Sequence, residues 1–360
     1  MTPKPESVPA VWMRGGTSKA LFFHEKHVPP LGTDRDRFLM RIMGSPDPMQ
    51  IDGMGGTYPV TSKIAIIRPS EREDADVDFI FVQVSVNEKF VDYDAGLAIP
   101  HKKSASINLC LRRKSWLPIN PNTGRFLEKG EYMIAGCPGS GSPILMDYRY
   151  TIGGGVDRGL LPTGRPIDSM DLDGNSIQHT ICDAAHIIAF AYASDFGLKG
   201  DEHPKAINEN QEVLAKVRRF RGQAAFKVGM CSHPSTVDQE SPILPMVALL
   251  SPASDAEAHI QSRLFLDNAC HSAMAGAGAT CTAAASRIKG SLVADIMKPK
   301  ALKEGVFNVQ HPSGILPITI STGPSDDEDL PTFETLSFVR TARYLMKGEL
   351  FVPEDLDVSF

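Results

Sequence analysis

Two runs of the sequence are rich in β-branched and aromatic residues: Val-Thr-Ser-Lys-Ile-Ala-Ile-Ile at positions 60–67 and Val-Asp-Phe-Ile-Phe-Val-Gln-Val-Ser-Val at positions 77–86. The second run alternates in the manner of a strand with one buried face. Acidic residues at positions 71–76 lie between the two runs. The pattern therefore predicts two paired strands joined by an acidic turn, within a larger sheet.

Strand-like and helix-like runs continue along the chain, separated by turns that draw on 30 Gly and 27 Pro. Further strands are predicted at residues 144–150, 247–251 and 316–321, helices at 209–223 and 336–346, and loops at 153–155 and 322–324. The chain is thus predicted to be an α+β protein. A Gly- and Pro-rich stretch at 143–163 predicts a boundary between domains at residues 1–150 and 151–335.

The composition excludes several classes of protein. The chain has 360 residues, 42% of them hydrophobic and 22% charged, with 37 Lys+Arg against 43 Asp+Glu and a net charge of −6. These values are typical of a globular protein with a sizeable core. The mild acidity argues against nucleic acid and anionic membranes as partners, and the longest apolar run, residues 187–193, is too short to span a bilayer. We expect a cytoplasmic protein.

The six cysteines lie at positions 110, 137, 182, 231, 270 and 281, without Cys-x-x-Cys spacing. A structural zinc site needs three or four ligands, usually paired at short spacing. The scatter therefore argues against zinc and favours buried, reduced thiols.

The first candidate site motif is Met-Arg-Gly-Gly-Thr-Ser-Lys at residues 13–19. Gly15 and Gly16 allow close approach of the backbone to a ligand, and Thr17 and Ser18 add hydroxyl and N–H donors. Arg14 can hold a carboxylate through two hydrogen bonds. An anion-binding loop and a plain Gly-rich turn are equally good interpretations of the residues alone.

The second motif runs from Gly44 to Lys63 and includes Gln-Ile-Asp-Gly-Met-Gly-Gly at residues 50–56. Lys63 stands between Ser62 and an apolar strand, where loss of water lowers the pKa of a lysine toward that of a usable base. The alternative is an ordinary surface lysine on a strand. The other candidate substrate contacts of this motif are Asp52, Gly55, Gly56 and Ser62.

Two further motifs lie in the second half of the chain. A Gly-Ala-Gly-Ala turn at residues 276–279 opens a small-residue helix, whose free N–H groups suit a carboxylate. His-Pro-Ser-Gly at residues 311–314 combines a proton carrier and a hydroxyl in a tight turn. Either motif can also be purely structural. The candidate substrate contacts here are His271, Gly276, Gly278, Thr280, His311, Ser313 and Gly314.

Taken together, these motifs resemble the PrpF-like isomerase family, which includes 4-oxalomesaconate tautomerase and the methylaconitate, methylitaconate and aconitate isomerases. The matching stretches occur in the family's order. They are residues 13–19, 43–47, 50–56, 61–63, 160–164, 270–286, 311–314 and 339–343.

The resemblance implies the diaminopimelate-epimerase-like fold, with two similar barrel-like domains, each around a central helix, and the active site in the cleft between them. It also implies that residues 336–360 return to the first domain. The family needs no metal or organic cofactor and moves a proton between two carbons of an unsaturated di- or tricarboxylate. Lys63 matches the family's proposed catalytic lysine.

The chain departs from the family after Val-Asp-Tyr at residues 91–93. The family continues with Asn-Cys-Gly-Asn, whose cysteine is the other proposed catalytic group and whose residues open the central helix of the first domain. Here the sequence continues Asp-Ala-Gly-Leu, and the next cysteine is Cys110. Residues 96–121 are unlike the family, so either Lys63 works with another partner, such as His271, or activity is impaired.

The leading hypothesis is a cofactor-independent isomerase or tautomerase of an unsaturated polycarboxylate, with Lys63 as base. The alternative is a carboxylate-binding relative that has lost catalysis. Amino-acid racemase chemistry, known from the fold's relatives, needs a cysteine at each helix start, and Ala275 stands where the second would lie. The sequence leaves open which polycarboxylate is the substrate and whether the protein is a homo-oligomer.

Overall fold

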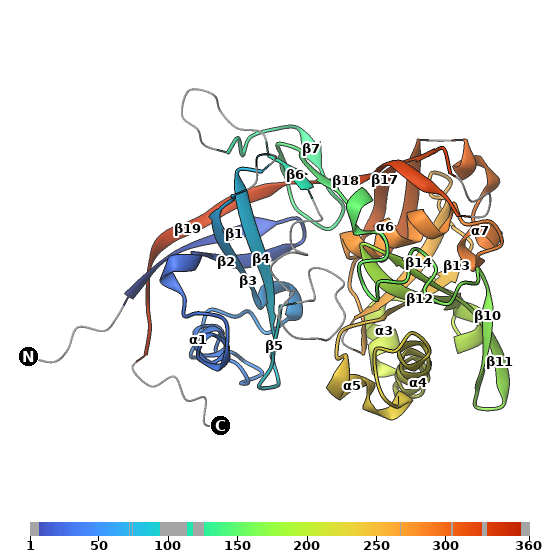
Figure 1. The fold of residues 1–360 in the computed structure, drawn as a ribbon, viewed down its shortest axis with the longest axis horizontal. Coiled ribbons are helices and arrows are strands. Elements are labelled where there is room, and N and C mark those ends of the chain that lie inside the picture. Colours follow the sequence, from blue (N-terminus) through green and yellow to red (C-terminus); the bar gives the residue numbers. More distant parts are fainter. Residues whose placement is uncertain are drawn as a thin grey trace, which may run out of the picture.

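We analysed a computed structural model of the chain, which describes residues 7–71, 73, 75–93, 114–117, 126–266, 268–303, 305–325 and 330–353. The chain forms two β-sheets that lie side by side, each with its own helices (Figure 1). The first sheet is built largely from the N-terminal residues, and the second from the middle of the chain. Strand β19, near the C-terminus, crosses from the second sheet to the first.

The first sheet has six strands in the order β19-β1-β2-β3-β4-β5. Strands β3 and β4 are antiparallel, with Lys63 opposite Gln83, which confirms the strand pair predicted from residues 60–67 and 77–86. The bounds are β1 Ser7–Gly15, β2 Ser18–His24, β3 Lys63–Pro69, β4 Val77–Val84, β5 Val91–Asp92 and β19 Ala342–Phe351.

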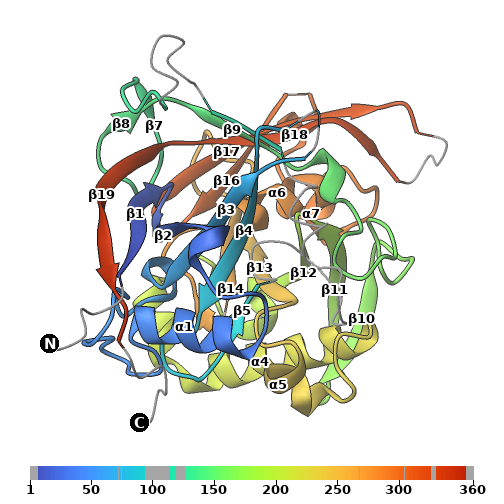
Figure 2. The ribbon, with the colours of Figure 1, turned by 60° about the vertical axis from the view of Figure 1, so that its left-hand side comes forward.

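Helix α1, Thr33–Met43, covers this sheet (Figure 2). Its apolar residues recur at helical spacing, so one stripe of the helix faces the sheet. Phe38, Leu39 and Met43 on that stripe join Leu21 and Ile64 of the sheet in one buried cluster. The predicted central helix of the first domain and Cys110 fall in residues 94–113, outside the described residues.

The second sheet follows the order β10-β11-β12-β13-β14-β16-β17-β18-β9-β6, with β15 paired to β14. Strands predicted at residues 247–251 and 316–321 are confirmed as β13 and β17, although β17 also takes in Thr322 and Gly323, which were predicted to be a loop. The strand predicted at residues 144–150 is confirmed only as far as Asp147, as β9, because a 3-10 helix begins at Arg149. The bounds are β6 Lys114–Trp116, β9 Ile144–Asp147, β10 Asp168–Leu172, β11 Asn175–Ala184, β12 His186–Tyr192, β13 Met246–Ser251, β14 Ile260–Leu266, β15 Ala269–Cys270, β16 Val306–His311, β17 Gly314–Gly323 and β18 Thr332–Arg340. Strands β7, Tyr132–Met133, and β8, Ser140–Gly141, form a separate hairpin.

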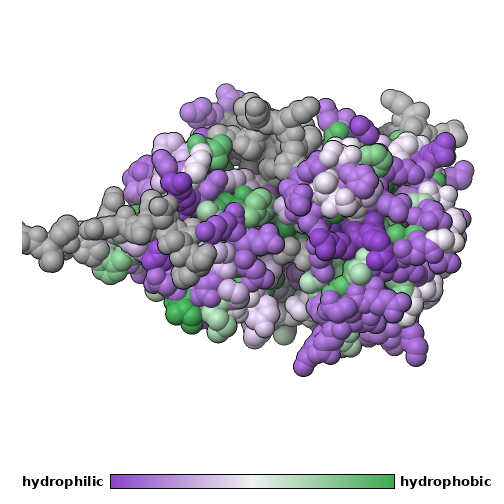
Figure 3. Space-filling view, turned by 90° about the horizontal axis from the view of Figure 1, so that it is seen from below, coloured by the Kyte–Doolittle hydropathy of each residue, from purple (hydrophilic) through white to green (hydrophobic). Residues whose placement is uncertain are grey.

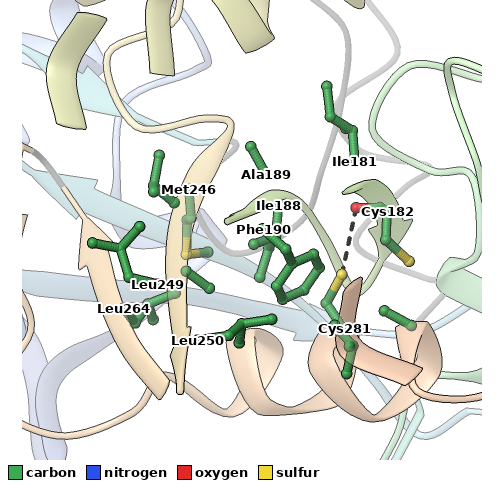
Figure 4. Packing of buried hydrophobic residues seen from close by; sticks show 14 of the residues in the cluster. Ile181, Cys182, Ile188, Ala189, Phe190, Met246, Leu249, Leu250, Leu264 and Cys281 are labelled. Carbon is green, nitrogen blue, oxygen red and sulfur yellow. Dashed lines mark hydrogen bonds between the residues drawn. The ribbon is translucent and has the colours of Figure 1, made fainter. Parts of the chain in front are cut away.

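Helix α6, Gly276–Ala285, lies inside the curve of the second sheet and confirms the predicted small-residue helix. It contacts β11 and β12 toward one end of the strand order and β16, β17 and β18 toward the other. Only small side chains allow so close an approach, and residues 277–285 are all buried. Cys281 packs against Cys182 of β11, to whose carbonyl oxygen its thiol donates at 3.4 Å (Figure 4). Among the described strands the sheet stays open, with β10 and β6 at its ends, so the predicted closed-barrel detail is not confirmed.

The remaining α-helices pack against the second sheet or against one another. The helix predicted at residues 209–223 is confirmed as α4, Gln211–Lys227, which Asn210 caps by accepting from the N–H of Val213. The others are α3 Pro204–Glu209, α5 Val237–Glu240 and α7 Leu292–Ile296, with 3-10 helices at Glu25–His27, Pro59–Thr61, Arg149–Thr151, Ala193–Phe196, Pro234–Thr236 and Pro299–Leu302.

The helix predicted at residues 336–346 is wrong, because this stretch forms strands β18 and β19. Strand β18 pairs with β17 and β9, whereas β19 pairs along β1 in the first sheet. Backbone pairing with strands distant in sequence outweighs the local pattern here. The division at residue 150 stays a prediction, and two strands that precede it, β6 and β9, pair within the second sheet.

The coloured surface in Figure 3 is mostly hydrophilic, with hydrophobic residues in small, separate groups. Among the described residues, no helix has both the length and the apolar character that a membrane span requires. Hydrophobic residues instead gather in the two buried clusters, one under each sheet.

Candidate active site

We call the parts of the molecule built on the first and the second sheet its two halves, and the region where they meet the junction. Lys63 begins strand β3 in the first half, and its charge acts on His271 of the second half. Its Nζ donates a hydrogen bond to Oε1 of Gln83 at 2.5 Å and lies 4.8 Å from the ring centroid of Phe81. Burial lowers the pKa of Lys63 to about 8, while the Asp92 carboxylate opposes this effect. A lysine with such a pKa is partly neutral near physiological pH and can accept a proton.

The amide of Gln83 can take only one orientation. Its Nε2 donates to the carbonyl oxygens of Pro59, Ser62 and Val84, at 3.1, 2.8 and 3.3 Å. The Oε1 atom must therefore point toward Lys63. This orientation fixes the lysine nitrogen at the end of its flexible side chain. Gln83 was not among the residues predicted for the site, because its importance depends on strand register.

The loop that precedes Lys63 is held in shape by side-chain hydrogen bonds and close packing. Gln50 Nε2 donates to the hydroxyl groups of Ser45 and Ser62, and its Oε1 accepts from the N–H of Thr57. A Cβ at Gly55 would overlap the Gln50 side chain. Ser62 is fully buried, so both Ser62 and Gly55 serve to pack this loop.

Two other residues predicted as substrate contacts in this loop have structural surroundings of their own. A Cβ at Gly56 would come within 2.6 Å of the Thr61 hydroxyl, so this glycine is required for packing. Asp52 forms an ion pair with Arg41 of helix α1 at 2.6 Å, and its side chain is 75% exposed. Asp52 therefore anchors the loop to the helix, and we do not retain it as a ligand contact.

The loop at residues 14–18 packs against Thr341, where the chain passes from strand β18 of the second sheet to strand β19 of the first. Nη1 of Arg14 donates to the carbonyl and hydroxyl oxygens of Thr341, at 3.0 and 3.1 Å, and the N–H of Gly16 donates to the same carbonyl at 2.9 Å. Gly16 has a φ of +61°, which favours glycine. Part of Arg14 is thus used to join the halves, and a role for its other nitrogens with Gly15, Thr17 and Ser18 in holding a carboxylate stays a prediction.

In both His271 and His311, Nδ1 of the imidazole accepts a hydrogen bond from the backbone N–H two residues later. The backbone N–H of Ala273 donates to Nδ1 of His271 at 2.9 Å, and that of Ser313 donates to Nδ1 of His311 at 3.2 Å. The Ser313 hydroxyl donates to the carbonyl of Ser272 at 2.7 Å and joins the two turns. Because Nδ1 accepts in each ring, a neutral imidazole carries its proton on Nε2.

Both imidazoles are neutral near pH 7. Burial, together with the charge of Lys63, lowers the pKa of His271 to about 4, although the backbone hydrogen bond with Ala273 opposes this effect. Burial likewise lowers the pKa of His311 to about 4, with a contribution from Arg340. Lys63 and His271 therefore lie within electrostatic reach across the junction. Each Nε2–H is available as a neutral donor, since neither has a hydrogen-bond partner among the described residues.

The start of helix α6 provides backbone donors. Ala275, at the N-cap, offers no side-chain hydrogen bond, so the first N–H groups of this ten-residue helix find no acceptor in the N-cap side chain. Gly276 packs against the ring of Phe338, which a Cβ would overlap, and Gly278 packs against Leu264. The hydroxyl of Thr280 donates to the carbonyl of Gly276. Thr280 and Gly278 are therefore structural, and the donors are main-chain groups.

A small hairpin tip completes the junction. A Cβ at Gly136 would lie 3.4 Å from both Thr17 and Ser313, one from each half, and a Cβ at Gly314 would lie 3.0 Å from Ala135. The tip thus contacts the Gly-rich loop of the first half and the turn at residues 311–314. These contacts bring together the first and fourth sequence motifs, more than 290 residues apart.

Arg340 is the main site residue that the residue-by-residue prediction missed. It ends strand β18, next to Thr341, and its guanidinium carbon lies 4.5 Å from the ring centroid of Phe338. The sequence feature that could have pointed to Arg340 is its place in residues 339–343, one of the stretches that resemble the PrpF-like family. Among the described residues, no group of three or more His, Cys, Asp or Glu side chains could hold a metal ion.

The structure thus presents an α+β protein with a lysine prepared for proton transfer, neutral donors opposite it and cationic groups nearby. The chain belongs to the PrpF family, whose model, described as "PrpF protein", matches residues 6–97 and 117–353. The gap between the two matched stretches, residues 98–116, falls within the stretch 96–121 where the sequence departs from the family motif. As a member of this family, the protein is an isomerase.

Characterised relatives are similar over almost their whole length. The chain is 32% identical to 3-methylitaconate isomerase of Eubacterium barkeri, covering 96% of this chain and 97% of that protein. It is 30% identical to (4E)-oxalomesaconate Delta-isomerase of Novosphingobium sp. (strain KA1), covering 96% and 98%. The crystal structure of a methylitaconate-delta-isomerase superposes with a TM-score of 0.71 at 30% identity, over 97% of this chain and 96% of that one.

The fold extends beyond this family. A hydroxyproline epimerase from Agrobacterium vitis superposes with a TM-score of 0.54 at 10% identity, covering 99% of this chain and 95% of that one. This similarity shows the fold alone, and it confirms the epimerase-like α+β class that the sequence predicted.

Proposed function

We propose that the protein is a cofactor-independent isomerase that shifts a proton, and with it a C=C bond, within an unsaturated di- or tricarboxylate. The observation that carries this proposal is the pairing of Lys63, whose pKa burial lowers to about 8, with the neutral His271 of the other half. The relatives support the substrate class, because their names specify methylitaconate and oxalomesaconate.

Lys63 is the base of the proposed reaction. Its neutral amine takes a proton from the substrate carbon next to the C=C bond, so that a C–H bond breaks and an N–H bond forms. The electron pair left on carbon delocalises over the C=C bond and the adjoining carboxylate. The ammonium of Lys63 then returns a proton to the far carbon of the three-carbon unit. The double bond moves by one position and the composition of the substrate is unchanged.

The second half stabilises the anion formed between these two steps. The N–H groups at the start of helix α6 and the Nε2–H groups of His271 and His311 are donors held in place before the substrate arrives. Such preorganised donors lower the barrier, because they need no rearrangement as charge develops on the carboxylate. Neutral imidazoles also do not protonate the lysine, so they leave it free to act as base.

Proton NMR in heavy water tests this proposal. The purified protein is incubated with methylitaconate, methylaconitate, aconitate and oxalomesaconate, and the vinylic and methylene signals are followed. We expect loss of these signals and growth of an isomer for one of the acids, with the activity unchanged after dialysis against a chelator. Tricarballylate, a saturated tricarboxylate, serves as the control and should show no exchange. Silence with all four acids, from folded protein, would contradict the proposal.

A further inference from the structure

Four polar groups at the junction act on one another electrostatically. Lys63 acts on His271, and both His271 and Arg340 act on His311. The two neutral imidazoles thus link the neighbourhood of Lys63 to that of Arg340. A substrate that contacts both Lys63 and Arg340 would have its reacting carbon near the lysine and a carboxylate near the guanidinium.

None of the carboxylates in the described part of the chain is paired with Arg340. Its Cδ would lie 2.8 Å from a Cβ on Gly16, and its guanidinium stacks over Phe338. The titratable groups that act on it are the phenols of Tyr132 and Tyr148, and burial lowers its pKa. Its guanidinium makes no hydrogen bond or ion pair with any residue that the structure describes.

Other arginines with restricted exposure are partnered within the chain. Arg149 pairs with Asp147, and Arg221 pairs with Asp238. Arg263 and Arg287 donate to backbone carbonyls. An enclosed cation is costly unless it is paired, so an arginine left open at a junction between domains indicates that an anionic ligand supplies the partner.

We propose that Arg340 binds the substrate carboxylate remote from the carbon at which Lys63 acts, and thereby selects polycarboxylates over monocarboxylates. The inference rests on the proposed function for the placing of the reacting carbon, but not for the binding itself. A planar guanidinium can hold a carboxylate through two parallel hydrogen bonds. Gly16 of the Gly-rich loop packs against the Arg340 side chain and leaves room for it.

Calorimetric titration with two unreactive probes tests this role. Tricarballylate carries three carboxylates and butyrate carries one, and neither has a C=C bond to be moved. Arg340→Gln should weaken tricarballylate binding by about 10- to 100-fold, because it removes a charge-assisted pair, and should change butyrate binding much less. Arg340→Lys should have an affinity for tricarballylate between those of wild type and Arg340→Gln, since an ammonium keeps the charge but not the two-point contact.

Arg287→Gln is the matched control, because Arg287 also stacks over a phenylalanine, Phe307, at 5.8 Å. Its hydrogen bonds to Ser286 and Ala301 would be lost, so this variant should melt at a lower temperature with unchanged probe selectivity. Arg340→Gln should instead melt at or above the wild-type temperature without ligand, because it removes an unpaired cation.

The inference is overturned if Arg340→Gln binds both probes within about twofold of wild type, or loses affinity for both equally. It is also overturned if this variant melts well below wild type while the affinities hold. Absence of turnover with Arg340-dependent tricarballylate binding would instead sink the proposed function and leave this inference standing.

Discussion

Lys63 in the first half of the molecule and the start of helix α6 in the second half are held in place by different means. Lys63 is positioned by side-chain amides, Gln83 directly and Gln50 through the loop beneath. Helix α6 is positioned by packing, with every residue from 277 to 285 buried inside the second sheet. The position of Lys63 thus depends on a few polar side chains, whereas the backbone donors of helix α6 depend on how the helix is packed.

This difference separates activity from stability. Replacing the reactive side chain of the first half should abolish turnover and spare the fold. The backbone donors of helix α6 cannot be removed by changing a side chain, so they can be disturbed only by displacing the helix. That displacement costs folding free energy, because protein interiors are close-packed.

The largest expected effect is that of Lys63→Met on proton transfer. Loss of the base should lower the rate of isomerisation by about 100- to 10,000-fold. The melting temperature should stay level or rise. The pKa of Lys63 is lowered in the folded state, so folding disfavours its charged form, and this cost is present below pH 8 and disappears as pH rises toward 10.5. NMR turnover and thermal melts at pH 7 measure the two effects.

Lys216→Met is the matched control for this substitution. Lys216 donates to a carbonyl oxygen, that of Asp195, and lies 5.4 Å from the ring centroid of Phe196, so it has the same kinds of contacts on helix α4. It should keep full activity. Turnover retained by Lys63→Met, or equal losses in the two variants, would end the assignment of Lys63 as base.

A smaller effect is expected for Gly276→Ala in the second half. The added methyl group overlaps the Phe338 ring, so the substitution should lower the free energy of unfolding by about 1–3 kcal/mol and reduce turnover together with it. Gly305→Ala is the control, because a Cβ there meets nothing within 4 Å. Denaturant titration compares the two. Gly276→Ala with wild-type stability and activity would contradict the packing of α6 described above.

The smallest expected effect concerns the pH dependence of the first half. With Lys63 as base, kcat/KM should rise with pH and level off above about 8, where the amine is neutral. The Asp92 carboxylate stabilises the ammonium, so Asp92→Asn should move this limb toward lower pH, by less than about one unit. Asp78→Asn is the control, since Asp78 pairs with Arg68. A shift toward higher pH in Asp92→Asn would refute the coupling.

Local sequence patterns predicted much of the fold. The β-branched runs at residues 60–67 and 77–86, the helical period at 209–223 and the small-residue helix after Ala275 correspond to elements of the structure. In each case one face or the whole segment is apolar, and burial follows the same period. The local pattern gave the wrong prediction for residues 336–346, because this stretch contains both helix formers and β-branched residues. Its pairing with strands distant in the sequence decides between helix and strand.

The roles of the candidate site residues stay predictions. The structure shows that Lys63 acts electrostatically on His271, and that the turn at residues 311–314 carries His311. Asp52 was predicted as a ligand contact, but its carboxylate forms an ion pair with Arg41, which becomes visible only when helix α1 is packed. Its carboxylate looked suitable for chemistry in the sequence, where its partner could not be identified.

The sequence by itself determined the composition of the site: a lysine at the head of an apolar strand, glycine-rich loops and two histidine turns, all within short stretches. Tertiary structure alone decided their use. Gln83 lies 20 residues after Lys63 in the chain and orients it because the strand register places the two opposite each other. Arg340 packs against Gly16, 324 residues earlier in the chain. The reason is physical, since residue type follows from local chemistry, whereas pKa, orientation and an open guanidinium depend on neighbours that only folding supplies.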